Sequence, residues 1–166
     1  MYLLDSNIYI NFYDRYYRKE FFPSFWENLP QILNASVIIP DIVIAENYQD
    51  SFLKNWLNNN YTKSYIRHKE FANSWGAVLV HIQNCGYYKE EALISDKGWA
   101  HERIADPWLI AIAKEKDYTI VTSELSVPSL SKVNPSRSAK IPDVCKQLKI
   151  RCIDMNQFFR EVELSV

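Results

Sequence analysis

Four acidic residues stand in four separate segments of this sequence, each beside a stretch typical of a buried strand or a helix. They are Asp5, Glu46, Asp106 and Glu124. Carboxylates that are brought together repel one another unless a proton or a cation lies between them. An all-oxygen cluster suits Mg²⁺ or Mn²⁺ better than Zn²⁺. Such ions lower the pKa of bound water and stabilise developing charge, so the pattern predicts metal-assisted phosphodiester hydrolysis.

Two short apolar segments are predicted to be strands that end at polar residues. Residues 2–4 lead directly into Asp5, and residues 118–122 lead into Ser123 and Glu124. Ligands bind outside the carboxyl ends of the strands in parallel α/β sheets. We therefore expect Asp5 and Glu124 to lie at one edge of a common sheet. Two further strands are predicted at residues 37–39 and 150–153.

Helical patterns occupy the segments between these strands. Ser24 and Glu27 form a capping box, which predicts a helix from there toward Leu33. Asp106 followed by Pro107 predicts another helix start. The remaining predicted helices are a short one after Asn7 and those at residues 41–57, 61–83, 88–93, 142–148 and 156–162. The alternation of strands and helices predicts a single α/β domain over residues 1–166, a three-layer α/β/α fold with a mainly parallel central sheet.

Each acid also has a purely structural interpretation. Asp5 and Asn7 are both suited to capping the turn or helix that follows the first strand. Glu46 is also consistent with the solvated rim of an apolar helix stripe. Asp106 is also consistent with a simple N-cap, although a helix N-terminus favours the ionised carboxylate that a hard metal requires.

Composition restricts the class of protein. Apolar residues make up 48% of the 166 residues, with only 3 Gly, which is typical of a folded domain. The 11 Tyr, 8 Phe and 5 Trp exceed what a small core normally buries, so some rings are candidates for stacking on a partner or on bases. Three cysteines without a C-x-x-C pair fit a reducing cytoplasm. No apolar stretch reaches the roughly 18 residues that a membrane-spanning helix needs.

The formal net charge of −1 provides no overall attraction to nucleic acid, so any polyanion must be bound by local basic patches. One candidate patch is the loop at residues 126–140, which contains no acid. Its basic side chains are Lys132, Arg137 and Lys140. We expect these three residues to contact the phosphates of a bound polyanion, although a solvated loop is the alternative.

Four motifs together resemble those of the PIN-domain nucleases, the fold shared by VapC-type toxins. They are LLDSN at the N-terminus, a Pro-then-helix segment that carries Glu46, ADPWLIAIA around Asp106, and IVTSE ending at Glu124. ADPWLIA followed by VTSE and KIPDVC is more similar still to one bacterial subfamily, known as DUF4411. The resemblance runs in order from Leu3 to Phe159, nearly the whole chain.

This resemblance implies a Mg²⁺- or Mn²⁺-dependent endoribonuclease whose acidic pocket is formed by the same four acids. Its implied partners are an RNA substrate and an antitoxin protein, with a homodimer as a further candidate and no membrane. Ser6, Asn7, Thr122 and Ser123 are then expected to orient carboxylates and waters, unless they serve only as turn residues. Glu124 stands where the wider family commonly has Asp, and its longer side chain is suited to binding metal through water.

Two other classes of function compete with this interpretation. In a receiver-like phosphotransferase Asp5 would accept a phosphoryl group, but that class leaves Glu46 and Glu124 unexplained. In a non-catalytic PIN-like module the fold would bind RNA or protein without cleaving it. Four clustered carboxylates argue against such a module, because they would repel phosphate.

Overall fold

The computed structural model of the chain describes residues 1–47 and 51–164. In that part of the chain, β1 (Tyr2–Leu4), β2 (Thr119–Val121) and β3 (Cys152–Ile153) form a parallel sheet in the order β1-β2-β3. Leu3 pairs with Ile120, and Val121 pairs with Ile153. Because all three strands run in the same direction, their carboxyl ends meet at one edge.

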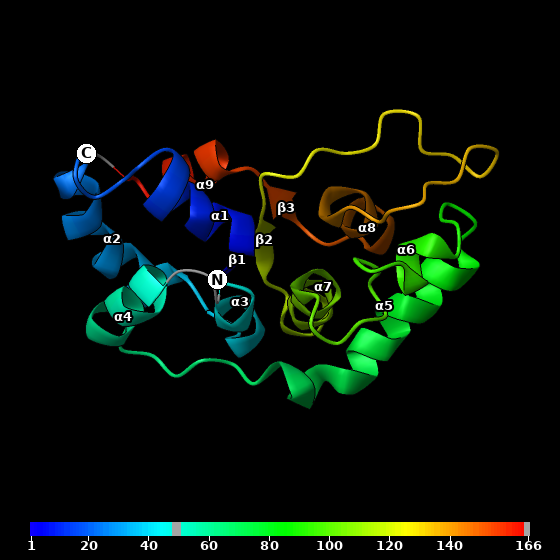
Figure 1. Ribbon diagram of the computed structural model, residues 1–166, viewed down its shortest axis with the longest axis horizontal. Helices are drawn as coiled ribbons and strands as arrows, with labels where there is room; N and C mark the ends of the chain where they lie inside the picture. Colours follow the sequence, from blue (N-terminus) through cyan, green and yellow to red (C-terminus); the bar gives the residue numbers. More distant parts are fainter. Residues whose placement is uncertain (48–50, 165–166) are drawn as a thin grey trace.

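Helices lie on both sides of this sheet (Figure 1). On one side are α7 (Ala105–Lys116) and α8 (Ile141–Leu148), with α5 (Ala72–Asn84) and α6 (Glu91–Ile94) beyond them. On the other side are α1 (Ser6–Ile10), its π-helical continuation η1 (Asn11–Arg15), α2 (Pro23–Ser36) and α9 (Met155–Glu161). The helices α3 (Asp41–Glu46), α4 (Ser51–Asn60) and the 3-10 turn η2 (His68–Phe71) complete the described chain. The α/β fold predicted from the sequence is confirmed.

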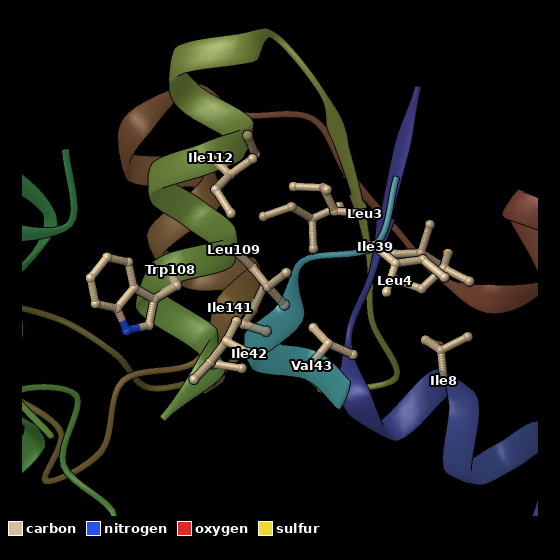
Figure 2. Close-up of a cluster of buried hydrophobic side chains, with 14 of the residues drawn as sticks. Leu3, Leu4, Ile8, Ile39, Ile42, Val43, Trp108, Leu109, Ile112 and Ile141 are labelled. Carbon is tan, nitrogen blue, oxygen red and sulfur yellow. The ribbon is translucent and has the colours of Figure 1, made fainter. Parts of the chain in front are cut away.

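The core is built around β1 and α7. Figure 2 shows Leu109 and Ile112 of α7 directed toward Leu3, with Ile8 of α1 beside Leu4. All of these side chains are fully buried, and each contributes about 1.5–3 kcal/mol relative to an exposed position. Residues 107–113 are buried all round α7, because the helix also packs against α5 and α8. The core therefore fixes the N-terminus of α7 beside the carboxyl end of β1.

The strand predicted at residues 37–39 is wrong in detail. Val37 makes one parallel bridge to Tyr2, and the amide of Ile38 donates to the Tyr2 carbonyl at 2.9 Å. Pro40 follows and has no amide hydrogen to donate, so the ladder cannot continue. This segment therefore extends the sheet only through its backbone contacts with Tyr2, on the side of β1 that does not pair with β2.

Two of the long predicted helices are shorter than expected. The described part of the helix predicted at residues 41–57 forms α3, which ends at Glu46, and α4, which continues to Asn60; residues 48–50 of that prediction lie outside the described residues. The helix predicted from Tyr61 begins only at η2. Residues before it are extended because the Ile66 amide donates to Ile39 and the Asp41 carboxylate accepts from the His68 amide at 3.0 Å. Pairing with distant backbone outweighs the local helical pattern here.

Both predicted helix caps are also wrong. Helix α2 begins at Pro23 with Phe22 at the N-cap, and no side chain caps it. Helix α7 begins at Ala105 with Ile104 at the N-cap, so Asp106 lies inside the first turn. Within the described residues, no helix is long and apolar enough to cross a membrane.

Candidate carboxylate site at the end of the sheet

Asp5 lies at the carboxyl end of β1 and is buried, with 1% of its surface exposed. Its amide donates to the Val121 carbonyl at 2.9 Å, which extends the β1–β2 ladder by one bond. One carboxylate oxygen, Oδ2, accepts from Thr122 Oγ1 at 2.9 Å and from Asn7 Nδ2 at 3.4 Å. The other oxygen has no hydrogen bond within the described part of the chain. Burial, and then the charges of Glu124 and Glu46, raise the pKa of Asp5 to about 6.

Glu46, at the end of α3, joins two other helices. Its Oε1 accepts from the Ala105 amide at 2.7 Å, and its Oε2 accepts from Ser6 Oγ at 2.5 Å. Glu46 therefore caps α7 from a distant segment, the role that the sequence had assigned to Asp106. Both oxygens of this carboxylate are engaged.

Asp106, in the first turn of α7, is partly buried, and its carboxylate makes no hydrogen bond to any described residue. Burial raises its pKa most strongly, and repulsion from Asp5, Glu124 and Glu46 raises it further. The charge of Lys140 acts in the opposite direction. All four predicted acids therefore lie close enough together to influence one another electrostatically.

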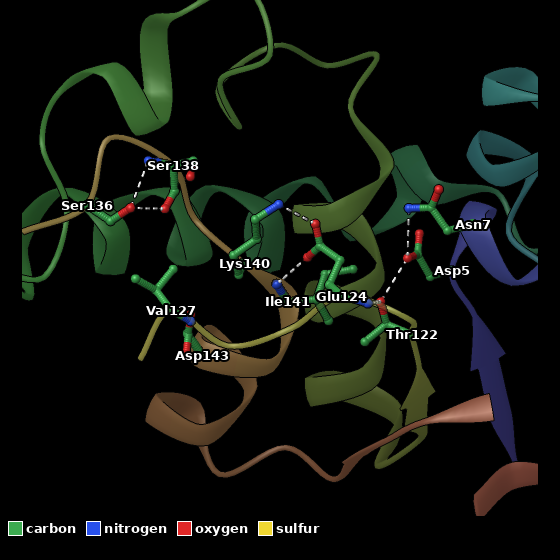
Figure 3. Close-up of polar contacts among 10 residues, drawn as sticks. All are labelled: Asp5, Asn7, Thr122, Glu124, Val127, Ser136, Ser138, Lys140, Ile141 and Asp143. Atoms are coloured by element: carbon green, nitrogen blue, oxygen red, sulfur yellow. Dashed lines mark hydrogen bonds and ion pairs between the residues drawn. The ribbon is translucent and has the colours of Figure 1, made fainter. Parts of the chain in front are cut away.

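Glu124 lies beyond β2 and contacts the start of α8. Its Oε1 pairs with Lys140 Nζ at 2.8 Å, and its Oε2 accepts from the Ile141 amide at 2.8 Å. Figure 3 shows these contacts continuing through Thr122 to Asp5 and Asn7. The hydrogen bond to Glu124 is the main reason why the pKa of Lys140 is raised. Glu124 is thus a helix cap and an ion-pair partner.

The four acids divide into two kinds of side chain. Both glutamates use both oxygens in hydrogen bonds, whereas the Asp106 carboxylate and one oxygen of Asp5 accept none from a described residue. Among the described residues, no three His, Cys, Asp or Glu side chains form a group that could hold a metal ion. Mg²⁺, however, keeps several waters and commonly binds through one or two carboxylates. The two aspartates fit such an ion as direct ligands, and the two glutamates fit the surrounding shell.

The four polar residues predicted to orient the site are placed differently. Ser6, Asn7 and Thr122 each donate to one of the four carboxylates. Ser123 instead accepts from Asn11 Nδ2 at 2.9 Å. Asn11 is buried and was not predicted, although it lies four residues after Asn7. That spacing places the Asn7 and Asn11 side chains on one face of a helix. The sequence therefore contained a signal from which Asn11 could have been predicted as a neighbour of the site.

The three basic residues of the loop at 126–140 do not gather in one patch. Lys140 lies in the site through its pair with Glu124. The Arg137 guanidinium approaches Glu91 at 3.8 Å, and Lys132 Nζ lies 5.9 Å from the centre of the Tyr87 ring. The loop itself is attached to α8, because the Val127 amide donates to Asp143 at 3.0 Å.

Replacing Thr122 by Val is expected to destabilise the protein. The Thr122 hydroxyl donates to Asp5 and accepts from the Glu124 amide at 3.1 Å. Valine has the same shape but leaves a buried carboxylate with one donor fewer, which costs about 1–3 kcal/mol. Urea unfolding in a chelating buffer measures this loss, and Thr122→Ser, which keeps the hydroxyl, serves as the control. Equal stability of Thr122→Val and wild type would show that this hydroxyl does not support Asp5.

Comparisons with known proteins add one relationship. Residues 2–166 match the family described as "Domain of unknown function (DUF4411)". Searches of curated proteins and of solved structures find no match.

Proposed function

The chain belongs to the DUF4411 family, and we propose that it is a Mg²⁺- or Mn²⁺-dependent endoribonuclease acting at the site of the four carboxylates. The family match carries no activity with it, so the proposal depends on the chemistry of the site and on the PIN-like motifs. The toxin role and an antitoxin partner stay predictions from that resemblance.

The observation that carries the proposal is the carboxylate of Asp106. It has no hydrogen-bond donor among the described residues, and it faces the charges of Asp5, Glu46 and Glu124. A charge withdrawn from water without a partner is costly even when it is only partly buried, and proteins normally pair such a charge or use it to coordinate a metal. Asp106 and Asp5 would hold a hard divalent cation, whose positive charge would offset this repulsion.

The residues of the chain then have separate tasks. Asp5 and Asp106 would hold the ion, which would supply an activated water and stabilise the charge that develops on phosphate. Thr122 and Asn7 fix the orientation of Asp5, while Glu46 fixes the start of α7 and therefore Asp106. Lys140 is held near the site by Glu124 and is available to bind a non-bridging phosphate oxygen.

The direct test of activity is cleavage of end-labelled single-stranded RNA by the purified protein. We expect fragments in Mg²⁺ or Mn²⁺ and none in excess EDTA, with activity restored when metal is added back. Cleavage that continues unchanged in EDTA would contradict a metal-dependent mechanism. A protein that binds RNA without ever cutting it would instead favour the non-catalytic module.

The basic loop residues provide a separate prediction about binding. If Lys132, Arg137 and Lys140 all contact phosphates, replacing them with Ala lowers the salt dependence of RNA binding by about 2 in log–log slope, at roughly 0.7 per contact. The structure makes Lys140 the residue nearest to the acids, so Lys140→Ala alone is expected to account for one contact. Fluorescence anisotropy at several salt concentrations measures the slope. An unchanged slope in the triple variant would mean that the loop does not contact the nucleic acid.

A further inference from the structure

The connection between η1 and α2 carries the exposed aromatic side chains found in the described part of the chain. Among the described residues, the aromatic rings that are exposed are Tyr16, Phe21 and Phe22, at 59%, 68% and 42%. All other described rings are buried or partly buried. A concentration of exposed apolar surface in one short segment is typical of a binding site. We call residues 15–22 the aromatic strip.

The backbone of the aromatic strip is held in place. The amides of Phe21 and Phe22 both donate to the Arg18 carbonyl, at 2.9 and 3.0 Å. The indole of Trp26 donates to the Tyr17 carbonyl at 2.6 Å, and the Tyr17 ring stacks on Phe25 at 4.6 Å. The exposed rings are therefore presented on an anchored backbone, so a ligand need not order the segment.

Positive charge alternates with these rings. Arg15, Arg18 and Lys19 are all exposed, and the Arg18 guanidinium lies 5.7 Å from the centre of the Phe21 ring. Arg18 also pairs with Glu20 at 2.7 Å. Arg15 and Lys19 form no ion pair with a described residue. Aromatic rings interleaved with cations are what single-stranded nucleic acids require, because bases stack on the rings and phosphates contact the cations.

The aromatic strip is connected to the carboxylate site. Arg15 Nη1 lies 3.5 Å from Asn11 Oδ1, and Asn11 Nδ2 donates to Ser123 Oγ at 2.9 Å. Ser123 immediately precedes Glu124. A strand bound along the strip from Phe21 toward Arg15 therefore approaches the acids from the side of α1.

We propose that the aromatic strip binds single-stranded RNA, with unpaired bases stacked on Tyr16 and Phe21 and phosphates bound by Arg15 and Lys19. This inference rests on the proposed ribonuclease function and specifies the substrate class. In a duplex the bases are already stacked on one another and their faces are not available, so the strip selects single strands. Phe22 contributes less, because its ring packs edge-on against Tyr17 at 5.6 Å.

The test is binding of a fluorescent single-stranded RNA in EDTA, where no metal-dependent cleavage interferes. A Tyr16→Leu/Phe21→Leu variant keeps apolar side chains but has no ring on which a base can stack, and we expect its affinity to fall about tenfold or more. Phe21→Tyr, which keeps a ring, is expected to bind like wild type. Ile94→Ala is the matched control, since Ile94 is 60% exposed on α6, at the opposite end of the molecule from α2 (Figure 1).

The charged residues are tested in the same assay. Replacing Arg15 and Lys19 with Gln is expected to reduce the salt slope of binding by about 1.4, at roughly 0.7 per contact. An unchanged slope would remove these two residues from the proposed contact.

The outcomes separate this inference from the proposed function. Wild-type RNA affinity in the double Leu variant would overturn the inference, even if the wild type cleaves RNA. An equal loss of duplex RNA binding would also overturn it, since stacking cannot explain that result. Selective loss of single-strand binding, in a protein that shows no metal-dependent cleavage, would support the aromatic strip and contradict the nuclease.

Discussion

Replacing Asp106 with Asn is expected to reduce metal-dependent RNA cleavage by at least about a hundredfold, because a metal contributes several kcal/mol of transition-state stabilisation. The amide is nearly the same size as the carboxylate, but it is neutral and holds a hard cation poorly. The Asp106 side chain makes no hydrogen bond to a described residue, so its replacement breaks no structural contact. Initial cleavage rates at saturating Mg²⁺ and Mn²⁺ measure the loss, and Asp5→Asn is expected to behave in the same way.

Glu102→Gln is the matched control for this experiment. It removes one negative charge four residues before Asp106, from an exposed position. Its cleavage rate is expected to equal that of wild type, which separates the loss of a ligand from a general change in charge. Wild-type turnover in a folded Asp106→Asn protein would remove Asp106 from the active site.

The second large expected effect is that Mg²⁺ changes the stability of wild type relative to that of the Asp106→Asn variant. In a chelating buffer at pH 7.5, Asp106→Asn is expected to melt at the same temperature as wild type or higher, because it removes a carboxylate that Asp5, Glu46 and Glu124 repel. On adding ~10 mM Mg²⁺, with an assumed dissociation constant of ~1 mM, the wild type gains about 1.4 kcal/mol, or roughly 3–6 °C. The variant is expected to gain little. Thermal melts of the two proteins, with and without Mg²⁺, measure both effects.

The pH dependence of the chelated wild type tests the same repulsion. Asp5 has a folded pKa of about 6, above its ordinary value of 3.8. A raised pKa means that Asp5 binds a proton more readily in the folded state, so its contribution to stability is greatest at low pH and is lost as the pH rises from about 4 to 6. For Asp5 alone the loss is about 3 kcal/mol. The same pH dependence in chelated wild type and Asp5→Asn, together with equal Mg²⁺ shifts in wild type and Asp106→Asn, would contradict a repulsive cluster.

The elements that carry the site were predictable because their signals are local. The apolar run before Asp5 and the β-branched run before Thr122 both form the predicted parallel strands. The apolar sequence after Asp106 forms α7, which begins two residues earlier than predicted, at Ala105. Since parallel strands place their carboxyl ends together, the sequence also predicted which residues the sheet would gather.

The contacts of the acids were not predictable, because they depend on segments far apart in the chain. Asp106 has the sequence context of a cap, but the Ala105 amide that begins α7 donates to Glu46, which lies 59 residues before Ala105. Glu124 was expected to bind through water because of its length, and no local pattern indicated that the same length allows it to reach Lys140 and the start of α8. Similarly, the helical pattern before η2 does not reveal that Ile66 pairs with Ile39.

The most direct test of the metal-dependent ribonuclease is to titrate Mn²⁺ while measuring both its occupancy, by electron paramagnetic resonance, and the rate of RNA cleavage. We predict that cleavage rises in proportion to bound Mn²⁺ in the wild type, and that both occupancy and cleavage are lost in Asp5→Asn and Asp106→Asn. Cleavage that is already maximal before Mn²⁺ binds, or Mn²⁺ occupancy that is unchanged in both variants, would contradict a metal held by these two aspartates.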